Sequence, residues 1–216
     1  MGKNLKNLQK ILDIGVIPII RTKSAEQAMQ VAEAINKGGV KVLEVTMTVP
    51  NALNVMEKVT SEFKGDILLG AGTVLDPETA RASILAGAEF IVTPCLNPEV
   101  IKICKRYSIP VIPGTMTPTE ILTAWELGAD LVKVFPIDVI GGPKYIKAVK
   151  APLPQVALVP TGGITLENTP EYIKAGADAV AAGTSLVDTK AVTEGRYDLI
   201  AENAKKFVEA VKNARS

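Results

Sequence analysis

Eight short apolar runs recur along the chain at a nearly constant interval, and this repeat limits the possible folds more than any other feature. The runs are rich in Val, Ile, Leu and Ala and cover residues 16–20, 42–46, 67–70, 90–93, 110–112, 131–135, 157–160 and 179–182. Their first residues lie about 20 to 26 residues apart, the length of one compact strand–helix unit. Continuous apolar runs of this length are typical of strands buried on both faces of a parallel sheet.

The segments between these runs carry signals for the starts and ends of helices. N-cap residues followed by proline or an acidic residue occur at Ser24, Asp76, Asn97 and Thr117. Glycines that suit the end of a helix precede the next apolar run at Gly38, Gly39, Gly87, Gly128 and Gly176. The chain is therefore expected to alternate between strands and helices.

This alternation predicts an α/β fold of the (β/α)8 TIM barrel type. We expect residues 1–216 to form a single barrel domain, with 1–10 as an N-terminal helix or extension. The alternative is an open doubly wound sheet. It is disfavoured because no G-x-G-x-x-G turn, which a dinucleotide-binding fold requires, follows the first run.

Composition excludes several classes of function. The chain has no histidine, which removes Ser-His-Asp and Cys-His catalysis, the usual zinc sites and imidazole bases. Its 24 basic and 23 acidic residues give a net charge of +1, so no overall field attracts nucleic acid or an anionic membrane surface. No run approaches the ~18 apolar residues of a membrane-spanning helix. We therefore expect neither nucleic acid nor a membrane as a partner.

The two cysteines, Cys95 and Cys104, are too few for a disulfide framework and too far apart for a CxxC motif. No apolar segment of the secretory type follows the N-terminus, because Asp13, Gly15 and Pro18 interrupt the first apolar run. These features predict free thiols and a cytoplasmic location.

Three charged residues lie at or near the ends of predicted strands, where a parallel sheet should be apolar. Arg21 follows the first run, Glu44 interrupts the second and Lys133 interrupts the sixth. A buried charge is costly unless it is paired or has a function. Active sites of barrels lie at the carboxyl ends of the strands, so Glu44 and Lys133 are expected to meet there.

Two interpretations of this pair are open. One is a structural ion pair that satisfies two buried charges. The other is covalent catalysis, because burial disfavours the charged form of a lysine and leaves a nucleophilic amine. Lys133 would then attack a ketone, and Glu44 would transfer protons as the general acid and base.

Glycine-containing turns follow several runs and predict a site for an anion. Gly162 and Gly163 follow the seventh run, and Gly183 and Thr184 follow the eighth, where barrels commonly bind phosphate. Glycines let backbone N–H groups approach oxygen atoms closely. The turn 70–73, which ends in Thr73, suits a small carboxylate, and 141–142 is either a phosphate contact or a simple turn.

These residues together resemble the family of 2-keto-3-deoxy-6-phosphogluconate (KDPG) and 4-hydroxy-2-oxoglutarate (KHG) aldolases. The resemblance extends over almost the whole chain. It rests on LEVT at 43–46, GAGTV at 70–74, PG at 113–114 with TPTE at 117–120, KVFP at 133–136 and PTGGI at 160–164. The order of these motifs on successive units makes the match specific.

The resemblance implies a class I aldolase, a carbon–carbon lyase that cleaves KDPG to pyruvate and glyceraldehyde 3-phosphate without a metal or other cofactor. It also implies 4-hydroxy-2-oxoglutarate as a second substrate and a homotrimeric assembly. Lys133 matches the Schiff-base lysine and Glu44 the general acid and base. The implied substrate-binding residues are Arg21, Thr73, Thr161, Phe135 and Pro94. The implied phosphate-binding residues are Gly162, Gly163, Gly183 and Thr184.

The chain departs from the family pattern at Thr48, where several members have an arginine that holds pyruvate. Carboxylate binding is therefore expected to depend on backbone N–H groups and Thr73. Two other functions remain open: another phosphate-binding barrel enzyme, such as an isomerase or synthase, and a non-catalytic or engineered self-assembling scaffold. Trp125 is expected in the core, with a subunit contact as the alternative.

Overall fold

The computed structural model describes residues 2–216, apart from the side chain of Lys3. Helices and strands alternate along almost the whole chain. Their bounds are α1 Lys3–Ile14, β1 Val16–Ile20, α2 Ala25–Lys37, β2 Val42–Thr46, α3 Ala52–Phe63, β3 Leu68–Gly72, α4 Pro77–Leu85, β4 Phe90–Val92, α5 Pro98–Arg106, β5 Val111–Ile112, β6 Gly114–Thr115, α6 Pro118–Glu126, β7 Val132–Val134, a 3-10 helix η1 Ile137–Val139, α7 Pro143–Lys150, β8 Leu158–Pro160, α8 Thr169–Lys174, β9 Val180–Ala182, α9 Thr189–Thr193 and α10 Tyr197–Arg215.

The residues predicted to begin and end helices adopt the expected conformations and hydrogen bonds. All four predicted N-cap side chains accept hydrogen bonds from backbone N–H groups of the first turn that follows them. Thr117 and Glu120 form a complete capping box at the start of α6. Gly39, Gly87, Gly128 and Gly176 have φ between +85° and +102°, a left-handed conformation that favours glycine over residues with a side chain.

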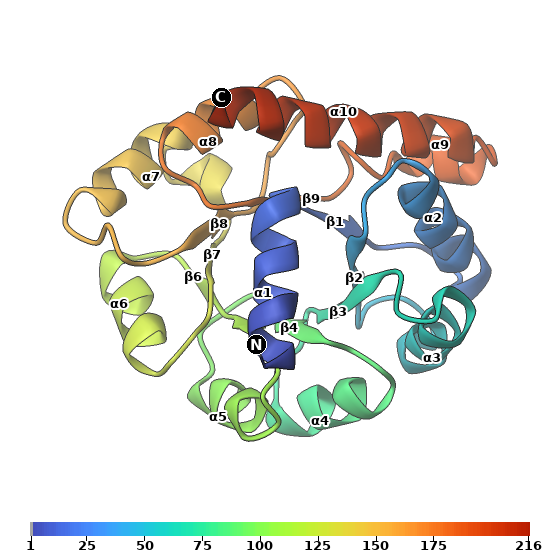
Figure 1. Cartoon of the computed structure of the whole chain (residues 1–216), viewed down its shortest axis with the longest axis horizontal. Coiled ribbons are helices and arrows are strands. Elements are labelled where there is room, and N and C mark those ends of the chain that lie inside the picture. The colour runs from blue at the N-terminus through green and yellow to red at the C-terminus, as the bar shows by residue number, and fades with distance from the viewer. Residues whose placement is uncertain (1) are drawn as a thin grey trace.

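The strands are parallel and form two sheets. The larger has six strands in the order β5-β4-β3-β2-β1-β9, and the smaller has three in the order β6-β7-β8. Each of the eight predicted runs overlaps a strand, but β3 extends two residues past the third run, and the fifth run is followed by a second short strand, β6. Pro113 separates β5 from β6, because proline has no N–H group to donate. Figure 1 shows the helices other than α1 on the outside of these curved sheets.

Buried side chains form two layers, one outside and one inside the curved sheets. The outer layer lies between the sheets and the surrounding helices. The inner layer contains side chains from both sheets, namely Ile17, Ile19, Val42, Leu68, Phe90, Val92, Ile112, Leu131, Val159, Ala179 and Ala181. Ile11 of α1 joins this inner cluster, and α1 crosses in front of the strands in Figure 1. Because α1 leads into β1, it covers the end at which the strands begin, and the opposite end remains for a site.

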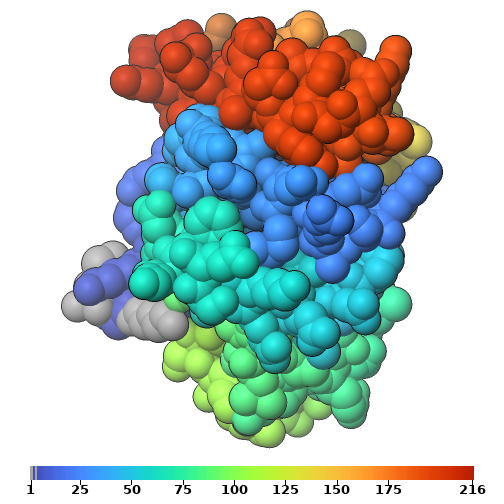
Figure 2. Space-filling model, turned by 90° about the vertical axis from the view of Figure 1, so that its right-hand side faces the viewer, coloured from blue at the N-terminus to red at the C-terminus, as the bar shows by residue number. Residues whose placement is uncertain are grey.

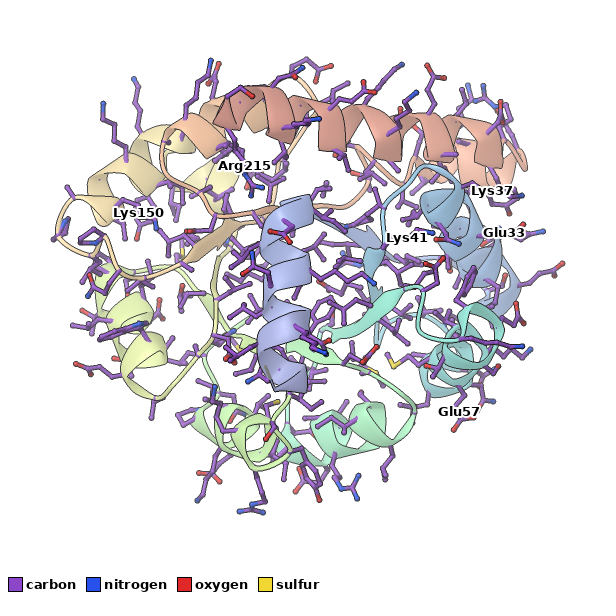
Figure 3. All side chains as sticks on the ribbon, in the orientation of Figure 1. Glu33, Lys37, Lys41, Glu57, Lys150 and Arg215 are labelled. Carbon is purple, nitrogen blue, oxygen red and sulfur yellow. The ribbon has the colours of Figure 1, made fainter. Side chains whose placement is uncertain are left out.

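The C-terminal helix α10 holds the first and last parts of the chain together. Figure 2 shows its surface next to that of α2, which is followed by α3. A side chain at Gly38 would overlap the carbonyl oxygen of Ala201, so glycine permits this close approach. The Arg215 guanidinium, labelled in Figure 3, donates hydrogen bonds to the carbonyl oxygens of Asp13 (3.1 Å) and Asp178 (2.7 Å).

The position of Trp125 differs from the prediction. Trp125 was predicted in the core, but its exposed fraction is 42%. The buried stripe of α6 runs through Ile121 and Ala124, and Trp125 lies about 100° around the helix from Ala124.

Cys95 is exposed and Cys104 is buried, and both are free thiols. Across residues 2–216, no helix is both long enough and apolar enough to cross a membrane.

Candidate active site

A cavity of about 390 Å³ opens at the carboxyl ends of the strands, opposite α1. Its lining includes all eleven residues that the sequence assigned to the site: Arg21, Glu44, Thr73, Pro94, Lys133, Phe135, Thr161, Gly162, Gly163, Gly183 and Thr184. These residues come from both sheets and from the loops that follow their strands. The fold therefore brings together positions that are up to 163 residues apart in the sequence.

Lys133 lies in the middle of β7, paired with Gly114 of β6 and Val159 of β8. Its exposed fraction is 7%, and its amine lies 4.9 Å from the centroid of the Phe135 ring. Burial is the main cause that lowers the pKa of Lys133 below its usual value of 10.5. The Glu44 carboxylate opposes this shift, and the Arg21 guanidinium adds to it. The environment thus favours the neutral, nucleophilic amine.

Glu44 lies in the middle of β2 and is 1% exposed. Burial is the main cause that raises the pKa of its carboxyl group above 4.5, while Lys133 and then Arg21 act to lower it. Among the residues that the structure describes, none forms a hydrogen bond with Glu44 Oε2, although this atom is buried. An unpartnered buried oxygen is rare in proteins, and a catalytic role is one of the explanations for it.

Glu44 and Lys133 influence each other's pKa but do not form a direct ion pair. None of the ion pairs found within residues 2–216 includes either side chain. The structural ion pair considered above is therefore absent between these two residues. A buried carboxyl and a buried amine that line one cavity without an ion pair can serve nucleophilic and acid–base chemistry.

The side chains predicted to hold a small anionic substrate surround this pair. Arg21 follows β1 and is exposed at the rim of the cavity. Thr73 has φ +58°, a left-handed conformation that is uncommon outside glycine and is often found at functional sites. Thr161 is 4% exposed. Thr48 is not part of the cavity lining, and its hydroxyl lies 2.8 Å from that of Thr46 instead.

The two predicted phosphate turns lie next to each other in the lining. The Ser185 hydroxyl joins them by donating a hydrogen bond to the carbonyl of Ile164, at 2.5 Å. Gly162 and Gly163 have φ +98° and +62°, and a Cβ on Gly163 would lie 2.6 Å from Cβ of Asp138. Within residues 2–216, the N–H groups of Gly162, Gly163 and Thr184 make no backbone hydrogen bond outside helices and strands. These N–H groups are therefore available to an anion.

Seven residues of the cavity lining were not predicted from the sequence. These are Ile19, Ile164, Thr165, Ala181, Ser185, Val187 and Thr189. Ile19 and Ala181 could have been found from strand alternation, because they precede Arg21 and Gly183 by two positions and share their face. The turn at 141–142 lies outside the lining, and Gly142 is the N-cap of α7, so it is a simple turn.

A second cavity of about 430 Å³ lies beside the first and shares Arg21, Val187 and Thr189 with it. Although it is larger, Lys133 and Glu44 are absent from its lining. We therefore place the chemistry in the first cavity. Over residues 2–216, no three Cys, Asp or Glu side chains gather in a way that could hold a metal ion.

Comparisons with known proteins show which family this chain resembles. Residues 8–203 match the family model described as KDPG and KHG aldolase. A protein of Escherichia coli strain K12 named KHG/KDPG aldolase is 35% identical over 212 residues, which cover 97% of this chain and 99% of that protein.

Two solved structures are similar in fold and sequence. One is KDPG aldolase from Legionella pneumophila, with pyruvate captured at low pH as a covalent carbinolamine intermediate. It has a TM-score of 0.86 and 34% identity, with 92% of this chain and 96% of that chain covered. The other is a cube-shaped protein cage designed by fusing symmetric oligomeric domains. Its TM-score is 0.85 at 33% identity, with 93% of this chain and 73% of that chain covered.

Proposed function

The chain belongs to the KDPG and KHG aldolase family, and we propose that it is a Schiff-base aldolase that cleaves KDPG to pyruvate and glyceraldehyde 3-phosphate. One observation carries the proposal: the buried amine of Lys133 and the buried carboxyl of Glu44 face one cavity without pairing directly. Family membership favours this carbon–carbon lyase over the isomerase or synthase alternative.

We infer that the scaffold is one closed (β/α)8 barrel, the single domain predicted for residues 1–216, of which residue 1 lies outside the described residues. Backbone hydrogen bonds between the two sheets support closure. The N–H of Asp178 donates to the carbonyl of Leu158 at 3.0 Å, and Thr161, which follows β8, forms a parallel bridge with Ala181 of β9. On the other side, β5 and β6 are separated by Pro113 alone.

The first half of the reaction joins the substrate to Lys133. The neutral Nζ attacks the C2 ketone and forms a carbinolamine. Glu44, protonated because burial raises its pKa, donates a proton to the C2 hydroxyl, which leaves as water and gives an iminium. The positive charge of the iminium now attracts electrons from C3.

The second half breaks the carbon–carbon bond. The Glu44 carboxylate accepts the proton of the C4 hydroxyl, the C3–C4 bond breaks, and its electron pair moves into the iminium to form an enamine. C4 leaves as the aldehyde carbon of glyceraldehyde 3-phosphate. The enamine takes a proton at C3, and hydrolysis of the resulting iminium releases pyruvate and the free amine. This sequence needs no metal or other cofactor.

The rest of the lining holds the two ends of the substrate. Thr73 and Thr161 bind the pyruvyl carboxylate, with Phe135 and Pro94 against its carbon atoms. The free N–H groups of Gly162, Gly163 and Thr184, together with Gly183, bind the phosphate. Arg21 supplies positive charge at the rim. The same amine and acid also cleave 4-hydroxy-2-oxoglutarate to pyruvate and glyoxylate, because both substrates share the 4-hydroxy-2-keto unit.

Trapping of the covalent intermediate tests this function. Incubation with pyruvate and borohydride should reduce the iminium to a stable adduct on Lys133, detected by intact mass and peptide mapping. An adduct on another lysine would remove the mechanism. No adduct together with no cleavage of KDPG would favour the scaffold alternative.

The active protein is a homotrimer in a cytoplasmic setting. Exposed apolar side chains at Met116, Trp125 and Leu127 support self-association, because large apolar groups at the surface favour contact with another chain. The similarity to a cage built from symmetric oligomeric domains agrees with this inference. Light scattering at several protein concentrations tests it, and a mass other than that of three chains would contradict it.

A further inference from the structure

We propose that Gly72 is a positioning residue for the catalytic acid, because the absence of a side chain at this position provides the space in which the Glu44 carboxylate lies. The inference rests on the proposed function, in which Glu44 transfers protons. Gly72 itself need not touch the substrate.

The geometry at β2 and β3 carries this inference. Gly72 is the last residue of β3 and pairs with Thr46, and its carbonyl accepts a hydrogen bond from the N–H of Met47 at 2.8 Å. A Cβ placed on Gly72 would overlap Oε1 and Cδ of Glu44 and would lie 2.6 Å from its Cγ. The three nearest atoms all belong to Glu44.

The backbone gives no other reason for a glycine at this position. Gly72 lies outside the left-handed region, so an alanine could adopt its conformation without strain. Glycine within a strand is unfavourable, because it loses more conformational freedom on folding and contributes no side-chain packing. The contact with Glu44 therefore accounts for the residue.

Gly70 provides a matched comparison on the same strand. Strand alternation places Gly70 and Gly72 on one face. A Cβ on Gly70 would overlap the ring of Phe90 rather than Glu44. After Leu68, the two glycines thus leave the next two inward positions of β3 without a side chain, one beside an apolar ring and the other beside a carboxylate. Only Gly72 should affect proton transfer.

The position of the Glu44 carboxylate depends on packing, because no hydrogen bond holds its Oε2 atom in the described part of the chain. A methyl group at position 72 would move the carboxylate without breaking a hydrogen bond at that oxygen. Such a displacement should slow proton transfer, since a general acid or base acts only within hydrogen-bond reach or through one water.

The test is a double-mutant comparison of wild type, Gly72→Ala, Glu44→Ala and the double variant Gly72→Ala/Glu44→Ala. We expect Gly72→Ala to lower kcat for KDPG by at least about tenfold while KM changes less than about twofold. In the Glu44→Ala background, the same substitution should cause no further loss of kcat. Gly72→Ala should also lower Tm when it is made in the wild-type protein. When it is made in the Glu44→Ala variant it should raise Tm, because the new methyl group fills the space that the Glu44 side chain has left.

A further variant tests rescue by a shorter acid. Aspartate at position 44 retracts the carboxylate from position 72, so Glu44→Asp should reduce kcat by a smaller factor in the Gly72→Ala background than in wild type. Gly70→Ala serves as the control: it should lower Tm by disturbing Phe90, yet its pH profile of kcat should match that of wild type. In contrast, the pH profile of kcat for Gly72→Ala should be shifted from that of wild type.

The outcomes separate this inference from the proposed function. Wild-type kcat in Gly72→Ala, or an equal loss of kcat in both backgrounds, would overturn the role of Gly72. The borohydride adduct on Lys133 of wild type reports the function independently of either result. If Gly72→Ala does not fold, recovery of a folded protein in Gly72→Ala/Glu44→Ala would support the inference, because the second substitution removes the overlap.

Discussion

Glu44 on β2 and Lys133 on β7 belong to different sheets and face the same cavity as a buried acidic group and a buried basic group that form no direct ion pair. Each favours the charged form of the other, yet burial is the larger influence on both pKa values. Neither group is therefore held in its charged form as firmly as in a close ion pair, and each can change protonation state during a reaction.

Replacement of Lys133 by methionine should abolish turnover without loss of the fold. Lys133→Met removes the nucleophile, so neither cleavage of KDPG nor the pyruvate adduct should be detected. The free energy of unfolding should not fall by more than about 1 kcal/mol, because the remaining Glu44 can be neutral in a buried site. Assays of cleavage, intact mass and urea denaturation measure these effects. Residual adduct formation in this variant would show that another lysine is the nucleophile.

The buried carboxyl should make stability depend on pH in a specific direction. In the Lys133→Met background, the pKa of Glu44 is above 4.5 in the folded state because of burial, so the folded state binds more protons than the unfolded state between 4.5 and that pKa. Stability should be fully present below pH 4.5 and decrease as pH rises through the folded pKa.

The matched comparison is Lys133→Met/Glu44→Gln, which lacks the ionisable group. Subtracting its urea unfolding free energies, measured from pH 4 to pH 9, from those of Lys133→Met isolates the contribution of Glu44. A difference that stays constant with pH, or one that favours Lys133→Met at high pH, would contradict burial as the main influence on this group.

In the wild-type background, Glu44→Gln should reduce kcat by about 10²- to 10⁴-fold, the range typical of a lost general acid–base. Glutamine has nearly the same shape, so the variant should still fold and fill the space beside Gly72. Single-turnover kinetics with KDPG should show slow cleavage as well as slow iminium formation, because Glu44 acts in both steps. A rate within twofold of wild type would leave Glu44 with a structural role only.

Much of the fold follows from local sequence, because each strand and cap is determined by adjacent residues. Every predicted apolar run overlaps a strand, and all four predicted N-caps form. The division of the fifth strand at Pro113 and the exposure of Trp125 were not predicted. Exposure of a helical residue depends on the direction in which the whole helix packs, and apolar character alone does not determine it.

Most of the candidate site also follows from local sequence. Charges within apolar strands and glycine pairs after strands stand out in sequence, and all of the assigned residues line the cavity. The role of Gly72 was not evident, because it depends on the space that Glu44 occupies across a strand pair. The hydrogen bond from Ser185 to Ile164 was not evident either, because it joins two loops that are distant in sequence.

The glycine turn after β8 should be required for binding of the phosphate end of the substrate. Gly163→Ala places a Cβ against Asp138 in a left-handed conformation, so the turn must move. Loss of one hydrogen bond to a charged group costs about 1.5–3 kcal/mol, which corresponds to a rise in KM for KDPG of roughly 10- to 100-fold. The rate of adduct formation with pyruvate, which has no phosphate, should remain within about twofold of wild type.

Gly39→Ala is the control for the backbone strain alone. Gly39 also has a left-handed φ, +85°, but no atom lies within 4 Å of its Cβ position and it is remote from the cavity lining. This variant should lower the free energy of unfolding by about 1 kcal/mol and leave KM unchanged. An equal rise of KM in both variants would show that strain, and not phosphate binding, causes the effect.

The two thiols should differ strongly in reactivity. Cys95 is exposed directly after Pro94 of the cavity, whereas Cys104 is buried, and burial raises its pKa to about 12. Because the thiolate is the reactive form, a disulfide reagent at pH 8 should modify one thiol per folded chain quickly and the second only after denaturation. Absorbance of the released reagent measures both phases. The Cys95→Ser variant should lose the fast phase alone, and a fast phase that persists in it would show that Cys104 is accessible in the folded chain.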